Sequence, residues 1–243
     1  MHTLIIIATY NERENIVPLV DQIIKMSNQF DVLVIDDNSP DGTAAAVKEK
    51  FGESRQVHLL ERPRKMGLGT AYTEGFRYGL GHNYDAIMTM DADFSHNPQQ
   101  IPAFLKTAET HEMVIGSRYI PGGATKNWSV FRKFISRTAN LFAHMILSLK
   151  PRDCTSGYRL FHSEVLKQVD FEAIKAEGYS YLIEFLYRAS GVGILIGETP
   201  IIFVDRIHGK SKISKREIVR AIQTILRLRF QSSPKSQSAL VKA

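Results

Sequence analysis

The chain has 243 residues, 44% of them hydrophobic, a size and composition that suit one large α/β domain with a substantial core. Its formal net charge of +6 favours anionic partners, such as phosphorylated substrates, phospholipid head groups or nucleic acid. The single cysteine, Cys154, excludes an intramolecular disulfide and a metal–thiolate cluster, and it favours a reducing compartment.

The N-terminus leads directly into a strand-like segment, without a basic region followed by a long apolar core. We therefore expect no signal peptide. No apolar run approaches the ~20 residues that span a bilayer. These two observations predict a protein that is soluble or lies on a membrane surface.

The first half of the chain alternates strand-like and helix-like segments. Continuous apolar runs predict strands, and apolar residues at helical spacing predict helices. Fully apolar strands separated by helices are typical of a parallel sheet covered on both faces, so we expect an α/β fold with a mostly parallel central sheet flanked by helices. The predicted strands are residues 3–8, 32–35, 57–60 and 86–90, and the predicted helices are residues 15–26, 43–50 and 68–80.

Polar clusters follow three of these strands, at residues 9–12, 36–38 and 91–93. Ligands of parallel sheets bind beyond the carboxyl ends of the strands. We therefore expect the three loops to converge on one cleft.

Asp91 and Asp93 form the most informative cluster, because they come directly after a buried strand. Mg²⁺ and Mn²⁺ prefer oxygen ligands and often take one or two carboxylates together with substrate phosphates. This pair is thus a candidate clamp for a metal–diphosphate, which points to nucleotide-sugar chemistry. The alternative interpretation is a solvated turn.

The second half is less regular. We expect one domain over residues 1–230, with a nucleotide-binding half at 1–110 and an acceptor half at 111–230, followed by a disordered tail at 231–243. The predicted extended segments are residues 113–115, 156–161 and 193–204, and the predicted helices are residues 130–149, 179–190 and 216–230.

The last of these helices is basic and amphipathic. From Lys210 to Arg229 there are seven basic residues and one acidic residue, and Ile218, Ile222 and Ile225 fall on one face of the helix. Such a helix can lie in the head-group plane of a membrane. Packing of the apolar face on the domain's own core is an equally good interpretation.

Motifs along the chain, from about residue 3 to residue 230, resemble those of the family 2 glycosyltransferases, which have the Rossmann-like GT-A fold and invert the anomeric centre. Within that family the chain looks most like the dolichol-phosphate (polyprenol-phosphate) mannosyltransferases. The segments that carry the resemblance are residues 8–12, 35–43, 62–72, 90–93, 116–119, 156–160, 203–206 and 209–212.

The resemblance implies transfer of mannose from GDP-mannose to a polyprenyl (dolichyl) phosphate, with Mg²⁺ or Mn²⁺ as cofactor. It also implies a cytoplasmic protein bound peripherally to the cytoplasmic face of a membrane, with a small membrane-anchoring subunit as a further partner and no nucleic acid. It assigns donor binding to Ala8, Tyr10, Glu12, Ile35, Asp37, Asp91, Ala92, Asp93, Arg206 and Lys212.

By the same resemblance, Asp91, Asp93 and Arg118 are the catalytic residues, and Ser95 joins the two aspartates around the metal. The acceptor phosphate is assigned to Arg118, Arg132 and Ser136, the last two of which share a helical face.

Simpler structural roles compete with several of these assignments. Glu12 can open the following helix, where a carboxylate is favoured, and Arg118 can form a surface ion pair. Gly67 and Gly69 are interpreted as a tight turn into the next helix, because the segment lacks the ending of a P-loop. His96 is expected to position the metal loop.

The chain departs from the family pattern at three points. Ala8 stands where the family often has proline, and Ser95 stands where some members have glutamine, which puts a third protein ligand to the metal in doubt. Many relatives also carry C-terminal transmembrane helices, and none is predicted here.

Three other functions compete with this prediction. A sibling enzyme that uses a UDP-sugar would have the same clefts. A nucleic-acid-binding module would interleave aromatic and basic residues, but there is no aromatic residue from Lys210 to Arg229. An inactive relative would have no need for the intact Asp91–Asp93 pair.

Overall fold

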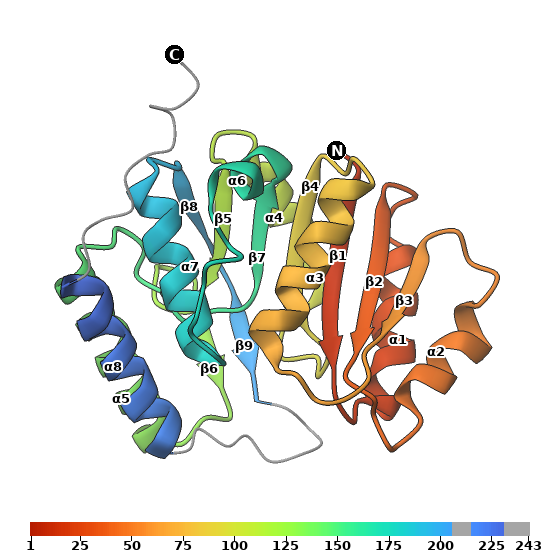
Figure 1. The fold of residues 1–243 in the computed structure, drawn as a ribbon, viewed down its shortest axis with the longest axis horizontal. Helices are drawn as coiled ribbons and strands as arrows, with labels where there is room; N and C mark the ends of the chain where they lie inside the picture. Colours follow the sequence, from red (N-terminus) through yellow and green to blue (C-terminus); the bar gives the residue numbers. More distant parts are fainter. Residues whose placement is uncertain (206–214, 231–243) are drawn as a thin grey trace.

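The computed structural model describes residues 1–205 and 215–230, so the predicted tail at 231–243 lies outside the described residues. A seven-stranded sheet runs through the middle of the molecule, with helices packed against it (Figure 1). The expected α/β fold with a mostly parallel central sheet is therefore confirmed.

The order of the strands across the sheet is β3-β2-β1-β4-β7-β5-β8. All neighbours pair in parallel except β7, which runs antiparallel to both β4 and β5. The strands are β1 (Thr3–Thr9), β2 (Phe30–Asp36), β3 (Val57–Glu61), β4 (Ala86–Asp91), β5 (Met113–Ser117), β7 (Arg159–His162) and β8 (Ile196–Pro200).

Helices cover both faces of this sheet because its strands are apolar on both sides. Along β1, Leu4 and Ile6 face a core with α3, α6 and α7, whereas Ile5 and Ile7 face a core with α1, α2 and α4. The helices are α1 (Arg13–Ile24), α2 (Thr43–Phe51), α3 (Leu68–Gly81), α4 (Ile101–Ala108), α5 (Val130–Leu147), α6 (Ser163–Gln168), α7 (Tyr179–Gly191) and α8 (Lys215–Phe230).

The second half of the chain departs in part from the sequence-based expectations. The strand expected at residues 156–161 begins only at Arg159. The extended segment expected at 193–204 is two strands, β8 and β9 (Ile202–Val204), which belong to different sheets. Helix α6 and the short strand β6 (Ala124–Lys126), which pairs with β9, were not predicted there, and neither was α4, which lies in the first half.

Helices α5 and α8 pack against each other at one end of the molecule, and α8 also packs on α7 (Figure 1). Ile225 and Leu228 of α8 are buried in the core that includes α7. The side of α8 that carries Ile225 therefore packs on the protein, whereas Ile222 and Leu226 are exposed. Among the described residues, no helix has the length and apolarity to cross a bilayer.

Two glycines set the path into α3, as expected. Gly67 has φ +95°, a conformation that favours glycine, and it directly precedes the helix. A Cβ atom on Gly69 would lie 2.6 Å from the ring of Tyr181, so the first turn of α3 approaches α7 closely. This approach forms one wall of the candidate active site.

Candidate active site

The carboxyl ends of β2, β1 and β4 lie side by side, as the sequence predicts. Ala8 in β1 is aligned with Ile35 in β2 and with Asp91 in β4. Beyond these ends lies a cavity of about 1050 Å³, which we call the polar cleft. Ala8, Glu12, Asp91, Ala92 and Asp93 line it from the strand ends, and residues 65–70 and 174–182 form its other walls.

The loop after β4 is held by its own polar side chains. The backbone N–H of Asp91 donates to Nδ1 of His96 at 2.9 Å, and Asp93 Oδ1 accepts the N–H and the hydroxyl of Ser95 at 3.1 and 2.6 Å. Burial lowers the pKa of His96, which favours the neutral ring that this acceptor role requires. His96 thus positions the loop, as expected.

Asp91 and Asp93 fit the coordination habits of Mg²⁺ or Mn²⁺. Both carboxylates line the polar cleft. In the part of the chain that the structure describes, no group of three or more His, Cys, Asp or Glu side chains gathers to enclose a metal. A site that takes two carboxylates and completes its coordination with substrate phosphates is the arrangement Mg²⁺ usually adopts. Ser95 lies behind Asp93, and its role as a third ligand stays a prediction.

The other predicted donor residues that the structure describes differ in whether they line the polar cleft. Glu12 lines the polar cleft and accepts a hydrogen bond from the side chain of Asn15 at 2.8 Å. Tyr10 is exposed, with the Lys65 ammonium 3.9 Å from the centroid of its ring. Ile35 is fully buried in the core. A direct contact of Tyr10 or Ile35 with the donor stays a prediction.

Asp37 holds a loop rather than lining the cleft in this structure. Its carboxylate forms an ion pair with Arg62 and accepts the N–H groups of Met66 and Gly67 at 3.0 and 3.1 Å. Arg62 also donates to the hydroxyl of Thr70 at 2.7 Å. The pair therefore fixes the 65–70 wall of the polar cleft, and a nucleoside contact of Asp37 stays a prediction.

A second cavity, of about 400 Å³, opens between α5, α7 and α8, and we call it the apolar pocket. Most of its lining is hydrophobic, with contributions from Phe134, Phe142 and Ile222. Asp91 lines both this pocket and the polar cleft. Asp91, the last residue of β4, therefore contributes to the walls of both cavities.

The predicted acceptor residues Arg118, Arg132 and Ser136 all line the apolar pocket, and Arg132 and Ser136 share one face of α5 as expected. Arg132 forms an ion pair with Asp205 at 2.8 Å, and its guanidinium lies 4.0 Å from the centroid of the Trp128 ring. Polar groups are therefore gathered at one part of an otherwise hydrophobic pocket.

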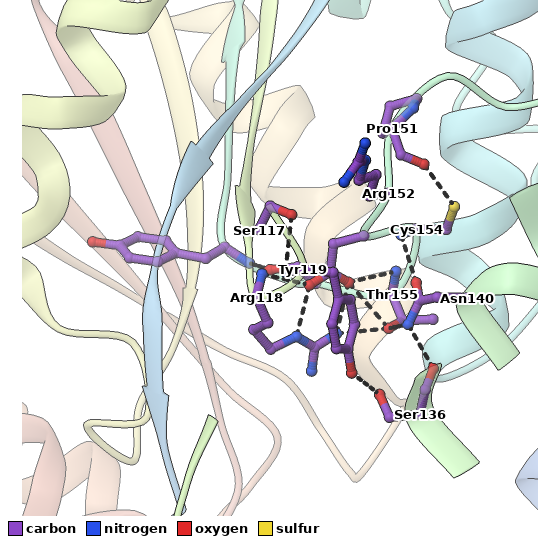
Figure 2. A network of polar contacts seen from close by, with 12 residues as sticks. Ser117, Arg118, Tyr119, Ser136, Asn140, Pro151, Arg152, Cys154 and Thr155 are labelled. Atoms are coloured by element: carbon purple, nitrogen blue, oxygen red, sulfur yellow. Dashed lines mark hydrogen bonds and ion pairs between the residues drawn. The ribbon is translucent and has the colours of Figure 1, made fainter. Parts of the chain in front are cut away.

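Arg118 is buried and paired with Asp153. Its Nε and Nη2 donate to the two carboxylate oxygens, each at 2.7 Å, and Nη2 also donates to the hydroxyl of Thr155 at 2.7 Å. Burial opposes ionisation of both groups, but each charge stabilises the other, so the pKa of Arg118 is raised and that of Asp153 is lowered. Figure 2 shows Arg118 within this network.

The Arg118 network continues into α5. The hydroxyl of Tyr119 donates to Oγ of Ser136 at 2.6 Å, and the side-chain amide of Asn140 donates to the hydroxyl of Thr155 at 3.1 Å (Figure 2). These contacts fix Arg118 and Ser136 relative to each other. Predicted donor residues Arg206 and Lys212 lie outside the described residues.

Asp153, Arg62 and Trp128 belong to the site but were not predicted to have a role in it. Asp153 lies in a loop 35 residues after Arg118. No local pattern marks such a partner. Arg62 lies within a segment that carries the family resemblance, and this was the one available signal.

The family model described as "Glycosyl transferase family 2" matches residues 4–170. An undecaprenyl-phosphate mannosyltransferase of Micrococcus luteus is 40% identical over 227 residues, which are 93% of this chain and 93% of that protein. A polyprenol monophosphomannose synthase of Mycolicibacterium smegmatis is 40% identical over 222 residues, which are 90% of this chain and 84% of that protein.

Among solved structures, glucosyl-3-phosphoglycerate synthase of Mycobacterium tuberculosis, in complex with Mn²⁺, UDP and glucosyl-3-phosphoglycerate, matches with a TM-score of 0.66. The match covers 93% of this chain and 79% of that chain, at 16% identity. At that identity the likeness establishes the fold, which agrees with the expected GT-A arrangement.

Proposed function

The chain belongs to glycosyl transferase family 2, and we propose that it transfers mannose from GDP-mannose to a polyprenyl phosphate, with inversion of the anomeric carbon. The names of the two relatives at 40% identity support the mannosyl group and the lipid phosphate. The observation that carries the proposal is the position of Asp91 between a large polar cleft and a hydrophobic pocket. One cavity suits a nucleotide sugar and the other an isoprenoid.

An acceptor phosphate is already ionised at neutral pH. Its oxygen forms a bond to the anomeric carbon of mannose, while the bond from that carbon to the β-phosphate oxygen breaks and its electron pair leaves with GDP. No proton has to be removed from the nucleophile, so the reaction needs no general base. The protein's tasks are to stabilise the leaving group and to align two anions that repel each other.

On the donor side, Asp91 and Asp93 would hold Mg²⁺ or Mn²⁺, which supplies the positive charge that stabilises the departing diphosphate. The proposal is supported by the position of Asp91 and Asp93 in the lining of the polar cleft and by the two hydrogen bonds from Ser95 to Asp93. Glu12 and Lys65 line the same cleft and would bind the nucleoside and its phosphates.

On the acceptor side, Arg118 and Arg132 would bind the lipid phosphate. Arg118 has its Nε and Nη2 committed to Asp153 and Thr155, which leaves Nη1 as the nitrogen that has no hydrogen-bond partner among the described residues. Guanidinium groups match phosphate geometry well. The hydrophobic side chains of α5, α7 and α8 would take the first isoprene units of the acceptor.

The test is transfer of labelled mannose from GDP-mannose to a polyprenyl phosphate, extracted into an organic phase. We expect Asp91→Asn and Asp93→Asn each to lower the rate by at least about 10²–10³-fold, because the leaving diphosphate loses its electrostatic stabilisation. Asp21→Asn, which changes a surface carboxylate on α1 paired with Lys25, serves as the matched control and should leave the rate unchanged. Near-normal transfer by both cleft variants would overturn the metal assignment.

A competition with GDP and UDP tests the donor. GDP should inhibit transfer and UDP should not. Labelling of the lipid from a UDP-sugar, with no labelling from GDP-mannose, would replace this donor by the sibling one.

A further inference from the structure

A third cavity, of about 750 Å³, opens on the side of Arg118 where α5 meets the loops that follow β5 and α5. We call it the basic hollow. Arg137 and His144 line it from α5, and Lys150 and Arg152 line it from the loop that follows that helix. Arg118 lies at its inner wall.

Among the residues that the structure describes, no acidic one lines the basic hollow. Arg137, Lys150 and Arg152 are exposed, and within the described part of the chain none of them forms an ion pair. Two nearby carboxylates are already engaged, Asp153 by Arg118 and Glu198 by the backbone N–H groups of residues 152 and 153, at 3.0 and 3.1 Å. The residues that line the hollow therefore carry a net positive charge.

The lining of the hollow also includes the imidazole side chain of His144. Its Nδ1 atom is buried and has no hydrogen-bond partner among the described residues. The side chain lines the hollow from the last turn of α5.

The basic hollow and the apolar pocket share a wall. Arg118 lines both cavities, Ser136 and Thr155 line the apolar pocket, and Tyr119 and Asn140 line the hollow. Figure 2 shows these five residues joined by hydrogen bonds into one network. The two cavities are therefore immediate neighbours on opposite sides of a polar partition.

Both cavities open along an exposed apolar stripe on α5. The stripe consists of Phe131, Phe134, Leu141 and Met145, whose side chains are 73%, 67%, 57% and 66% exposed. Phe134 lines the apolar pocket, and Leu141 lines the basic hollow. Exposed aromatic and aliphatic side chains next to basic ones are typical of helices that lie in a membrane interface.

We propose that the basic hollow binds the phosphate head group of an anionic phospholipid, whose acyl chains lie along the apolar stripe of α5. The occupant follows from the juxtaposition of unpaired cations, a cavity and an exposed apolar surface, which together match the two ends of a phospholipid. One bilayer facing α5 would then supply this lipid to the hollow and a lipid acceptor to the apolar pocket.

The experiment measures binding of the full chain to phosphatidylcholine vesicles, with and without phosphatidylglycerol, in the absence of nucleotide sugar. Its outcome is thus independent of the transfer reaction. We expect the double variant Lys150→Gln/Arg152→Gln to bind anionic vesicles about 25-fold more weakly, at about fivefold for each basic residue near a membrane surface. Binding to neutral vesicles should not change between the two proteins.

The matched control is Lys50→Gln/Arg55→Gln, which removes one lysine and one arginine from the exposed surface at and after α2. Helix α2 lies at the opposite end of the molecule from α5 (Figure 1). The control should weaken binding by less than about twofold, because charges beyond the Debye length of about 8 Å are largely screened. Equal losses in the two double variants would show a general charge effect and overturn the site.

Two further measurements complete the test. Arg137→Gln, a change on α5 rather than in the loop, should weaken binding to anionic vesicles by about fivefold, and unchanged binding in both hollow variants would overturn the proposal. Titration of inorganic phosphate examines the other source of the same chemistry. Phosphate binding that is lost in Lys150→Gln/Arg152→Gln, with vesicle binding unchanged, would identify a site for soluble phosphate and overturn the lipid assignment.

Discussion

Each half of the chain contains a buried aspartate–arginine ion pair, and the two pairs differ in their position relative to the cavities. Asp37–Arg62 lies beside the polar cleft, and Asp153–Arg118 lies beside the apolar pocket. Arg62 lines none of the three cavities, whereas Arg118 lines the apolar pocket and the basic hollow. The ion pair alone therefore does not mark an arginine as a candidate for ligand binding; the position of the guanidinium at a cavity wall does.

The further contacts of the two arginines also differ: Arg62 contacts the backbone, whereas Arg118 lies among aromatic rings. Arg62 also donates to the carbonyl oxygen of Gly67 at 3.1 Å, so it fixes the backbone path of the 65–70 wall. Arg118 lies among the rings of Tyr119, Trp128 and Phe203, at 5.3 to 5.6 Å from their centroids. The first pair shapes a wall, and the second presents a cation to a pocket.

The largest effect is expected when the two ion pairs are broken by replacing their aspartates. Asp153→Asn and Asp37→Asn should each lower the free energy of unfolding by about 3–5 kcal/mol, because each removes the carboxylate that pairs directly with a buried guanidinium. As an ion-pair partner among the described residues, Arg62 then keeps only the more distant Glu74, at 3.7 Å. Denaturant unfolding at neutral pH measures the loss. A loss below about 1 kcal/mol for either variant would show that its pair does not stabilise the fold.

The Asp153 pair also predicts a pH dependence. Arg118 lowers the pKa of Asp153 in the folded protein, so the stabilisation is complete above the unfolded pKa of about 3.9 and is lost as pH falls through the lower, folded pKa. Stability of the wild type should therefore fall more steeply than that of Asp153→Asn below about pH 4. Parallel pH profiles would contradict this assignment.

The next effect separates the two arginines by function. Arg118→Lys should lower kcat/KM for the polyprenyl phosphate by about 10²-fold and leave GDP affinity unchanged, because lysine keeps the charge but cannot bind Asp153 in a fork and also face the pocket. Arg62→Lys should do the reverse, weakening GDP binding with little change in the acceptor's KM. The same changes in GDP binding and in the acceptor's kinetic constants in both variants would show that the two pairs do not differ in function.

The smallest effect concerns the attachment of α8 to α7. Glu184 of α7 is buried and forms ion pairs with Arg227 of α8 and with Arg188 at 3.0 Å, whereas the exposed Glu177 binds Arg220 of α8 at 3.0 Å. Glu184→Gln should cost about 1.5–3 kcal/mol of stability and raise the acceptor's KM, because α8 lines the apolar pocket.

Glu177→Gln is the matched control for this change. An exposed pair contributes about 0–1 kcal/mol, so stability and the acceptor's KM should both stay close to those of the wild type. If the two glutamate variants behaved alike, Glu184 would not be the contact that positions α8.

The sequence determined most of the first half of the chain, residues 1–110, although it did not predict α4. Apolar runs and helical spacing located β1, β2, β3 and β4, and residues after β1 and β4 line one cleft as expected, whereas residues 36–38 after β2 do not line it. The physical reason is that neighbouring parallel strands end at the same edge of a sheet. Ala8, Asp91 and Asp93 could thus be brought together by a rule that needs no knowledge of distant contacts.

The arrangement of residues 111–230 depended on the tertiary structure. The strand expected at residues 156–161 enters the sheet antiparallel, between β4 and β5, and its loop brings Asp153 onto Arg118. Such a partner is set by the path of a loop, which no local spacing reveals. The sequence therefore identified Arg118 as a candidate, but only the packed chain showed which of its nitrogens are engaged and that one polar partition separates two cavities.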